Sequence, residues 1–274
     1  MKQRPTFPAR LDTTLAKNQP NTVGKPVLAP TKAATPHAQM SANAHSRPAP
    51  MPAPPQGHGM DSSAVRNRMV QKLAGQGITD AQVLGAMGAI ERHRFVDSAL
   101  MNQAYEDTSL PIGLGQTISK PGVVSRMLEL LRNGNPGKLG RVLEIGTGCG
   151  YQAAVLSLLA TEVYSIERLR GLHDKARDNL RHLRLANLHL LFGDGMVGYA
   201  KGAPYAGIIA AAGGEAVPQA WVDQLAVGGR LVAPVVTAGA PGAQALLVLD
   251  KTPQGVRQSL LEAVHFVPLK SGVA

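Results

Sequence analysis

Apolar residues recur every three or four positions in three stretches of the chain before residue 133, and this spacing predicts amphipathic helices. The predicted helices cover residues 62–73, 79–90 and 121–131. The last of them begins at Pro121, whose fixed φ suits the first turn of a helix. Residues 105–120, which precede it, are polar and contain glycine, so we expect a loop there.

Beyond residue 137, short apolar runs alternate with helical patterns. We expect strands at residues 141–145, 162–166, 188–192, 206–212 and 229–235, and helices at residues 151–159, 169–183 and 218–225. Two late strands, residues 243–249 and 258–267, have no helix between them, which indicates an antiparallel pair. The expected fold class is therefore α/β: a doubly wound, mostly parallel Rossmann-like sheet with an antiparallel C-terminal strand pair and N-terminal helices.

Residues 1–60 differ in composition from the rest of the chain. They are rich in Pro, Ala, Gln and Asn, and the run RPAPMPAPP at residues 47–55 excludes a helix or a central strand. So little apolar surface cannot offset the entropy lost on ordering. We therefore divide the chain into a disordered basic tail at residues 1–60 and one domain at residues 61–274.

The formal charge of +10 is concentrated in this tail. Residues 1–60 hold seven basic residues against one acidic residue, which leaves a net charge of +4 for residues 61–274. A basic tail can contact RNA, an anionic membrane or nothing, and we expect it to contact nothing. The domain has no cluster of Lys and Arg interleaved with aromatic residues, so we do not expect nucleic acid as a partner.

The composition argues against a disulfide-bonded, zinc-binding, membrane-spanning or secreted protein. The single cysteine, Cys149, rules out an intramolecular disulfide and indicates a reducing compartment. The eight histidines lack the paired spacing of a zinc site, so we expect no metal. No apolar run reaches the ~18 residues of a membrane span, and none follows Lys2 and Arg4 as a secretory signal would. We expect a cytoplasmic protein that does not enter a membrane.

The strongest local signal is the segment VLEIGTGCGY at residues 142–151. A buried strand leads into a glycine loop that allows close approach to a ligand, and a helix follows. In the G-x-G-x-x-G loop that binds a pyrophosphate, the third glycine would fall where this chain has Tyr151. The spacing, together with an acid inside the strand, favours S-adenosylmethionine over NAD as the cofactor. The expected cofactor-binding residues here are Glu144, Gly146, Thr147, Gly148 and Gly150.

Two more acidic residues follow the next two predicted strands. Glu167 comes directly after residues 162–166, and Asp194 lies two residues after strand 188–192. In a doubly wound sheet these positions adjoin the glycine loop. Glu167 can accept from both ribose hydroxyls and Asp194 from the adenine amino group, with Gly195 leaving room for the ring. The alternative is that both acids are ordinary turn or helix-cap residues.

Three segments together resemble protein-L-isoaspartate methyltransferases. They are residues 105–121 (YEDTSLPIGLGQTISKP), residues 142–152, and residues 193–234, and the family's FVPL sequence follows at residues 266–269. The QTIS segment is specific to this family, whereas the glycine loop is shared by many methyltransferases. The resemblance covers residues 61–274 and leaves the tail outside.

The resemblance implies transfer of a methyl group from S-adenosylmethionine to the α-carboxylate of L-isoaspartyl residues, a repair reaction on damaged proteins and peptides. It implies that Ser119 is the active-site residue, and that the cleft where methyl meets substrate is lined by Gln116, Thr117 and Ile118. Gln244 matches a late glutamine near the cofactor in relatives. We expect the protein to act as a monomer.

A carboxylate acceptor is already ionised at pH 7, so this reaction needs no general base. Ser119 suits the task of orienting the acceptor, and its alternative role is a cap of the helix that begins at Pro121. The sequence departs from the family pattern at Leu114, Gly122, Cys149 and Gly207. Two alternatives therefore stay open: a methyltransferase for another carboxylate or small molecule, and a non-catalytic protein that binds the cofactor.

Overall fold

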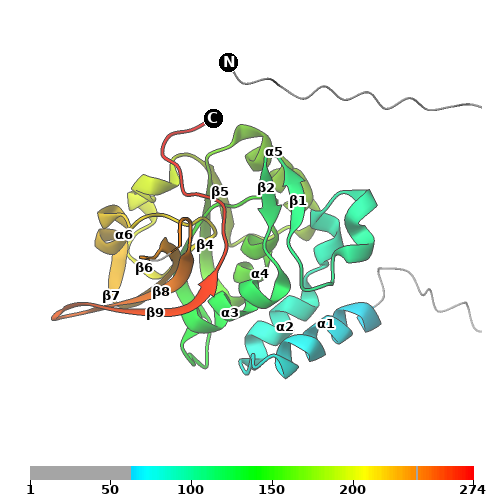
Figure 1. The fold of residues 1–274 in the computed structure, drawn as a ribbon, viewed down its shortest axis with the longest axis horizontal. Helices are drawn as coiled ribbons and strands as arrows, with labels where there is room; N and C mark the ends of the chain where they lie inside the picture. The colour runs from blue at the N-terminus through cyan, green and yellow to red at the C-terminus, as the bar shows by residue number, and fades with distance from the viewer. Residues whose placement is uncertain (1–62, 239) are drawn as a thin grey trace, which may run out of the picture. The chain divides into compact units, whose positions relative to one another are not determined.

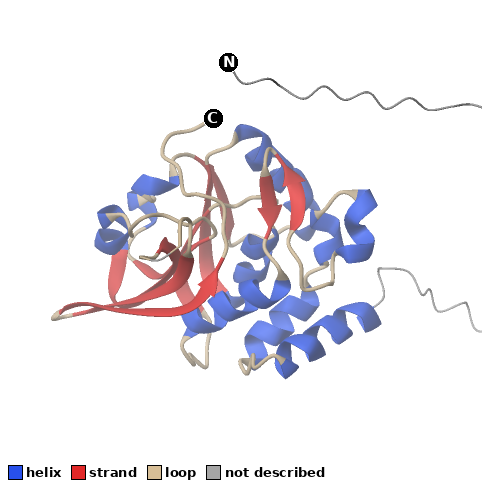
Figure 2. Cartoon of the chain, viewed as in Figure 1, coloured by secondary structure: helices blue, strands red, loops and turns tan. Residues whose placement is uncertain are grey.

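The computed structural model describes residues 63–238 and 240–274. The tail expected at residues 1–60 lies outside the described residues. Figures 1 and 2 show a central sheet with helices on both of its sides and a separate small hairpin. This arrangement is the α/β fold that the sequence predicts.

The central sheet has seven strands in the order β5-β4-β3-β6-β7-β8-β9. The strands are β3 (Leu139–Ile145), β4 (Ala160–Glu167), β5 (Leu188–Phe192), β6 (Tyr205–Ala210), β7 (Leu225–Val236), β8 (Gln244–Thr252) and β9 (Gly255–Val264). Neighbours from β5 to β7 are parallel, and β8 and β9 add to the β7 edge as antiparallel strands. The predicted Rossmann-like sheet with an antiparallel C-terminal pair is confirmed.

The chain reverses its direction of travel across the sheet after β5, because β3 has β4 on one side and β6 on the other. Val142 of β3 faces Val163 of β4 and Gly207 of β6. Such a reversal leaves a crevice beyond the carboxyl ends of the strands, where ligands of doubly wound sheets bind. The crevice here lies beyond the ends of β3, β4 and β6.

Six α-helices surround the sheet within the described residues. They are α1 (Ser63–Gly75), α2 (Ala81–Ala89), α3 (Pro121–Arg132), α4 (Tyr151–Leu159), α5 (Arg170–Leu180) and α6 (Gln219–Gln224). Short 3-10 turns complete the fold: η1 (Arg92–Phe95), η2 (Ser98–Gln103), η3 (Arg181–Leu183), η4 (Gly195–Val197) and η5 (Ala200–Gly202). The helix expected at residues 169–183 is divided between α5 and η3.

The prediction of a loop at residues 105–120 is wrong in one respect, because this segment contains a β-hairpin. Strands β1 (Leu110–Gly113) and β2 (Gln116–Ile118) pair antiparallel. Residues of β1 alternate between buried and exposed, so that Leu110 and Ile112 join the core. The turn between the strands includes Leu114 with φ +52°, a left-handed conformation that is uncommon outside glycine.

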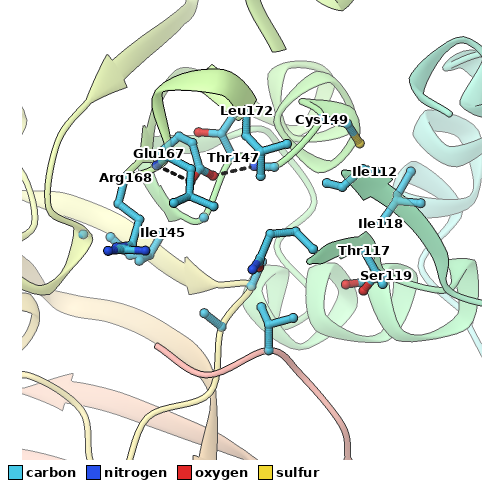
Figure 3. Close-up of a pocket in the computed structure, with 18 of the residues that line it drawn as sticks. Ile112, Thr117, Ile118, Ser119, Ile145, Thr147, Cys149, Glu167, Arg168 and Leu172 are labelled. Atoms are coloured by element: carbon cyan, nitrogen blue, oxygen red, sulfur yellow. Dashed lines mark hydrogen bonds between the residues drawn. The ribbon is translucent and has the colours of Figure 1, made fainter. Parts of the chain in front are cut away.

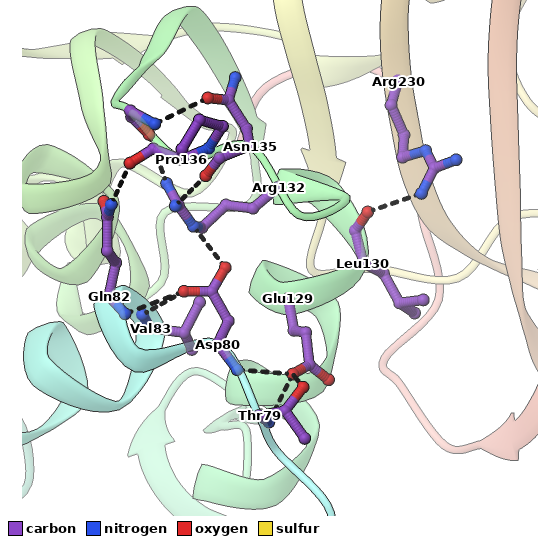
Figure 4. A network of polar contacts seen from close by, with 11 residues as sticks. Thr79, Asp80, Gln82, Val83, Glu129, Leu130, Arg132, Asn135, Pro136 and Arg230 are labelled. Carbon is purple, nitrogen blue, oxygen red and sulfur yellow. Dashed lines mark hydrogen bonds and ion pairs between the residues drawn. The ribbon is translucent and has the colours of Figure 1, made fainter.

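A polar network joins α2 to α3 and so fixes the N-terminal helices against the sheet (Figure 4). Asp80 caps α2 by accepting from the backbone N–H groups of Gln82 (2.9 Å) and Val83 (3.1 Å). Its other carboxylate oxygen accepts from Nε of Arg132 at 2.7 Å, where only 1% of the arginine side chain is exposed. Glu129, also on α3, accepts from the backbone N–H of Thr79 at 2.7 Å. Helix α3, which follows the QTIS segment, is therefore held to the start of α2 by two acidic residues and one arginine.

Candidate active site

A cavity of about 440 Å³ opens at the carboxyl ends of β3 and β4, beneath the β1–β2 hairpin. Its volume falls in the range of small-molecule sites. Figure 3 shows Thr147 and Glu167 on one side of the opening and Thr117 with Ser119 on the other. Predicted site residues that line it are Gln116, Thr117, Ile118, Ser119, Gly146, Thr147, Gly148, Glu167 and Gly195. Predicted residues outside the lining are Glu144, Gly150, Asp194 and Gln244.

The glycine loop is tied back onto β4. The backbone N–H of Gly146 donates to the carbonyl of Ile166 at 2.9 Å, which turns the chain sharply after β3. Gly150 then begins α4 with φ +92°, and a Cβ at this position would lie 2.7 Å from Cδ1 of Leu180. Backbone conformation and close packing both require glycine here. Gly150 therefore shapes the loop without touching the cavity.

Glu167 connects the ends of β3 and β4. Its Oε2 accepts from the backbone N–H of Gly148 at 2.9 Å, and its Oε1 accepts from the N–H of Leu169 at 2.9 Å. The side chain is 95% buried yet lines the cavity. A carboxylate has about four lone-pair sites, so two remain for ligand hydroxyl groups. The geometry is compatible with a carboxylate that is fixed in place and accepts from a ribose.

Glu144 lies beneath the loop, where its side chain is fully buried. Its Oε2 accepts a short hydrogen bond from the hydroxyl of Ser165, whose oxygen lies 2.6 Å from that of Thr147. The Oε1 atom has no hydrogen-bond partner, and burial raises the pKa of the carboxyl group to about 8. Glu144 thus acts on the cavity through Ser165 and Thr147.

The tip of β5 contributes Asp194 and Gly195. Asp194 uses Oδ1 to cap η4 and Oδ2 to accept from the N–H of Gly272 at 2.6 Å, so this carboxylate holds the C-terminal segment. Gly195 lines the cavity, and a Cβ there would come within 2.6 Å of Cγ2 of Ile145. Close packing on Ile145 thus requires glycine at position 195, whereas Asp194 lies outside the cavity lining and accepts two backbone hydrogen bonds.

Ser119 lies between β2 and α3 and is free of local hydrogen bonds. The N-cap of α3 is Lys120, and Ser119 makes no hydrogen bond within residues 63–238 and 240–274. The N–H of Gly122 in the first turn of α3 instead donates to Oδ1 of Asp107 at 2.7 Å. The alternative role of Ser119 as a helix cap is therefore wrong, and its hydroxyl group is available to a ligand.

Gln244 anchors a segment that sequence reasoning did not place at the site. Its side-chain amide accepts from the N–H of Phe266 at 2.8 Å and donates to the carbonyl of the same residue at 3.2 Å. Residues 267–270 continue from there along the cavity wall. The FVPL sequence at residues 266–269, part of the family resemblance, was the available signal for this wall; the strand expected at residues 258–267 ends at Val264 instead.

The departures from the family pattern have local packing explanations. A Cβ at Gly122 would lie 2.9 Å from Oδ1 of Asp107, so the absent side chain makes room for the carboxylate that caps α3. A Cβ at Gly207 would lie 3.1 Å from Leu131 of α3. Cys149 lines the cavity but is buried, which raises the pKa of its thiol to about 11. These positions leave the cavity open.

No helix of the described residues is both long and apolar enough to cross a membrane. The same residues contain no group of three or more His, Cys, Asp or Glu side chains arranged to hold a metal ion.

The fold and the cavity together define an S-adenosylmethionine-dependent methyltransferase. A strand-end crevice, a G-x-G-x-G loop and a buried carboxylate facing the cavity fit a cationic nucleoside without a phosphate. A model of the family described as protein-L-isoaspartate(D-aspartate) O-methyltransferase matches residues 64–274. The chain belongs to this family, as its sequence resemblance indicated.

Relatives and solved structures agree with this assignment. A protein-L-isoaspartate O-methyltransferase of Methylibium petroleiphilum is 62% identical over 220 residues, which cover 80% of this chain and 81% of that protein. One of Leptothrix cholodnii is 57% identical and covers 92% of this chain and 88% of that protein. A solved protein-L-isoaspartate O-methyltransferase aligns with a TM-score of 0.68 at 27% identity, covering 76% of this chain and 67% of that one.

A second solved structure, from Plasmodium falciparum, aligns with a TM-score of 0.64 at 24% identity and covers 75% of this chain and 98% of that one. That protein was crystallised with S-adenosyl-L-homocysteine. At this level of identity the alignment shows the shared fold, which is the fold described above for residues 63–238 and 240–274.

Proposed function

We propose that this chain transfers a methyl group from S-adenosylmethionine to the α-carboxylate of L-isoaspartyl residues in damaged proteins and peptides. Family membership supports the reaction. The observation that carries the assignment of the site is the position of Ser119. Ser119 lines both the deep cavity and an outer groove. This position supports a role at the point where a donor in the cavity meets an acceptor that arrives from outside.

The residues of the cavity have distinct tasks. When bound, S-adenosylmethionine supplies an electrophilic methyl group on a sulfonium. Glu167 binds the ribose hydroxyls, and the loop from Gly146 to Gly148 offers backbone contacts to the amino-acid end. Ser119 donates its hydroxyl hydrogen to the acceptor carboxylate and fixes its orientation. Because the acceptor is already an anion, alignment rather than proton removal lowers the barrier.

The β1–β2 hairpin limits access of water to this reaction. Ile112 and Ile118 are buried side chains of the hairpin that line the cavity, and Leu172 of α5 lines it as well. Leu114 at the turn sits over Gly171, where a Cβ would come within 3.1 Å of its Cδ1 atom. These apolar side chains cover part of the cavity and so reduce the access of water to the reacting groups.

The test uses labelled S-adenosylmethionine and two peptides that differ only in an isoaspartyl or an aspartyl linkage. We expect base-labile label on the isoaspartyl peptide alone. Ser119→Ala should lower kcat/KM about 10- to 100-fold, the effect of one hydrogen bond to a charged group, with cofactor affinity unchanged. Ser98→Ala, at an exposed serine outside the cavity lining, is the matched control. Equal labelling of both peptides would reject the proposed acceptor.

We further infer that the chain acts as a monomer in the cytoplasm, without nucleic acid, and that residues 1–60 are not needed for catalysis. Among the described residues, those that line the cavity lie between residues 112 and 270, which supports the view that the tail is not needed. A variant that begins at residue 61 should keep the kcat/KM of the full chain and sediment as a single copy. Loss of activity on removal of the tail would contradict the proposal.

A further inference from the structure

A second groove, of about 380 Å³, lies on the outer side of Ser119. One wall is formed by Ser119, Lys120 and Val123 around the start of α3, the other by residues 263–266 at the end of β9, and Ser109 also lines the groove. Ser119 belongs to the lining of this groove and to that of the deep cavity. A chain lying in the outer groove would therefore pass directly beside the hydroxyl group that faces the cofactor cavity.

The wall formed by residues 263–266 continues into a strand with one open edge. β9 is the last strand of the sheet and pairs only with β8, where Ala263 faces Ala245 and Val264 faces Gln244. On the other edge, the backbone N–H and C=O groups of β9 have no strand partner among the described residues. Such an edge binds an extended peptide through main-chain hydrogen bonds.

The proposed reaction calls for recognition of this kind. Damaged aspartyl sites arise in many sequence contexts, so an enzyme that repairs them cannot depend on one particular set of flanking side chains for binding. Main-chain hydrogen bonds meet this requirement because every residue except proline carries the same donor and acceptor. The open edge of β9 supplies such groups next to Ser119.

We propose that the acceptor polypeptide binds as an added strand along the open edge of β9 and in the outer groove, and that Lys120 favours an acidic side chain next to the acceptor residue. The proposal rests on the proposed function, because it names how the acceptor of that reaction is held. The groove would hold an extended segment of a damaged protein, and the charge of Lys120 would determine which neighbouring side chain is preferred.

The charge of the groove supports the role given to Lys120. Its exposed side chain has no hydrogen bond and no ion pair within the described residues. Two acids next to the groove-lining segments are engaged elsewhere: Glu262, which precedes Ala263, pairs with Arg126 at 2.8 Å, and Asp107 accepts from the N–H of Gly122. The basic side chains that line the groove are thus Lys120 and His265, with no opposing acid in its lining.

The pairing with β9 is tested by an N-methylation scan of one isoaspartyl peptide. Each backbone amide on one side of the acceptor is methylated in turn, and KM is measured along with the affinity of a fluorescent copy for the enzyme saturated with S-adenosylhomocysteine. Amides of an added strand point alternately towards and away from its partner. We expect about a tenfold loss of affinity at every second position and little change at those between. A loss without this alternation would overturn the pairing.

The role of Lys120 is tested with peptides that carry Glu, Gln or Lys beside the acceptor. We expect the wild type to prefer Glu over Lys by about two- to fivefold in kcat/KM, through KM, which is the range of an exposed ion pair. The preference should disappear in Lys120→Gln, reverse in Lys120→Glu and shrink in about 0.5 M salt. Lys138→Gln, an equal change of charge at the opposite end of β3, is the control and should leave it intact.

These outcomes are separable from those of the proposed function. Peptides that bind with the alternating pattern but receive no methyl group would support the groove and reject the reaction. Methylation of the isoaspartyl peptide without alternation, or with a charge preference that survives Lys120→Gln, would support the reaction and overturn the groove.

Discussion

Replacing Glu144 by glutamine tests whether a buried proton stabilises the loop that forms the cofactor cavity. The side chain is fully buried, and burial raises the pKa of its carboxyl group from 4.5 to about 8. Between these two values the folded protein binds one proton more than the unfolded chain. The stability contributed by this group is therefore fully present below pH 4.5 and is lost as the pH rises to about 8.

The size of this effect follows from the width of the pH interval. Each pH unit within the interval lowers the free energy of unfolding by about 1.4 kcal/mol. Across the whole interval the group therefore changes the free energy of unfolding by an amount on the order of 5 kcal/mol. Glutamine has nearly the same shape but carries no ionisable proton. Relative to the wild type, Glu144→Gln should therefore gain stability steadily from pH 5 to pH 8, whatever its stability at pH 5.

The assay is urea unfolding, followed by circular dichroism at pH 5, 6, 7 and 8. The measured quantity is the difference in the free energy of unfolding between variant and wild type, because the contributions of all other groups cancel in it. Glu215→Gln, the same substitution at an exposed glutamate, is the matched control. A difference for Glu144→Gln that does not vary with pH would refute the buried neutral carboxyl.

Three further outcomes follow from packing and charge. Gly150→Ala should destabilise the fold by about 1–3 kcal/mol in urea and weaken cofactor binding, because it combines a left-handed φ with a contact on Leu180. Asp80→Ala should cost about 3–5 kcal/mol in the same measurement, since it leaves the buried Arg132 without its ion pair. Cys149, whose thiol pKa is about 11, should react with a thiol reagent at pH 8 only as fast as the fold opens; fast labelling of the native protein would contradict its burial.

The strands and helices were predictable where hydrophobic spacing is regular. The bounds expected at residues 151–159 and 188–192 are those of α4 and β5. The β1–β2 hairpin was not predictable from local pattern, because its strands have four and three residues and Pro111 interrupts the first. Its stability depends on packing Leu110 and Ile112 into a core formed by distant helices, which no local pattern reveals.

The sequence allowed us to predict that residues at the ends of successive strands lie together in one site. Glu167 and Gly195 line one cavity because parallel strands end at the same edge of a sheet. The direction of the Glu144 side chain was not predictable, because β3 is buried on both of its faces and either side was open to it. The position of residues 267–270 was not predictable either. It depends on the hydrogen bond between Gln244 and Phe266, which joins two segments that are distant in sequence.

The contact between Asp107 and Gly122 has a consequence for the reactive end of the cavity. The first turn of α3 needs an acceptor for its N–H groups, and a serine three residues before Gly122 is a natural supplier. Because Asp107 reaches across from another segment and satisfies this demand, the hydroxyl of Ser119 is spared for a different partner. An aspartate outside the lining of the cavity thus decides whether the hydroxyl of Ser119 serves the helix or the incoming polypeptide.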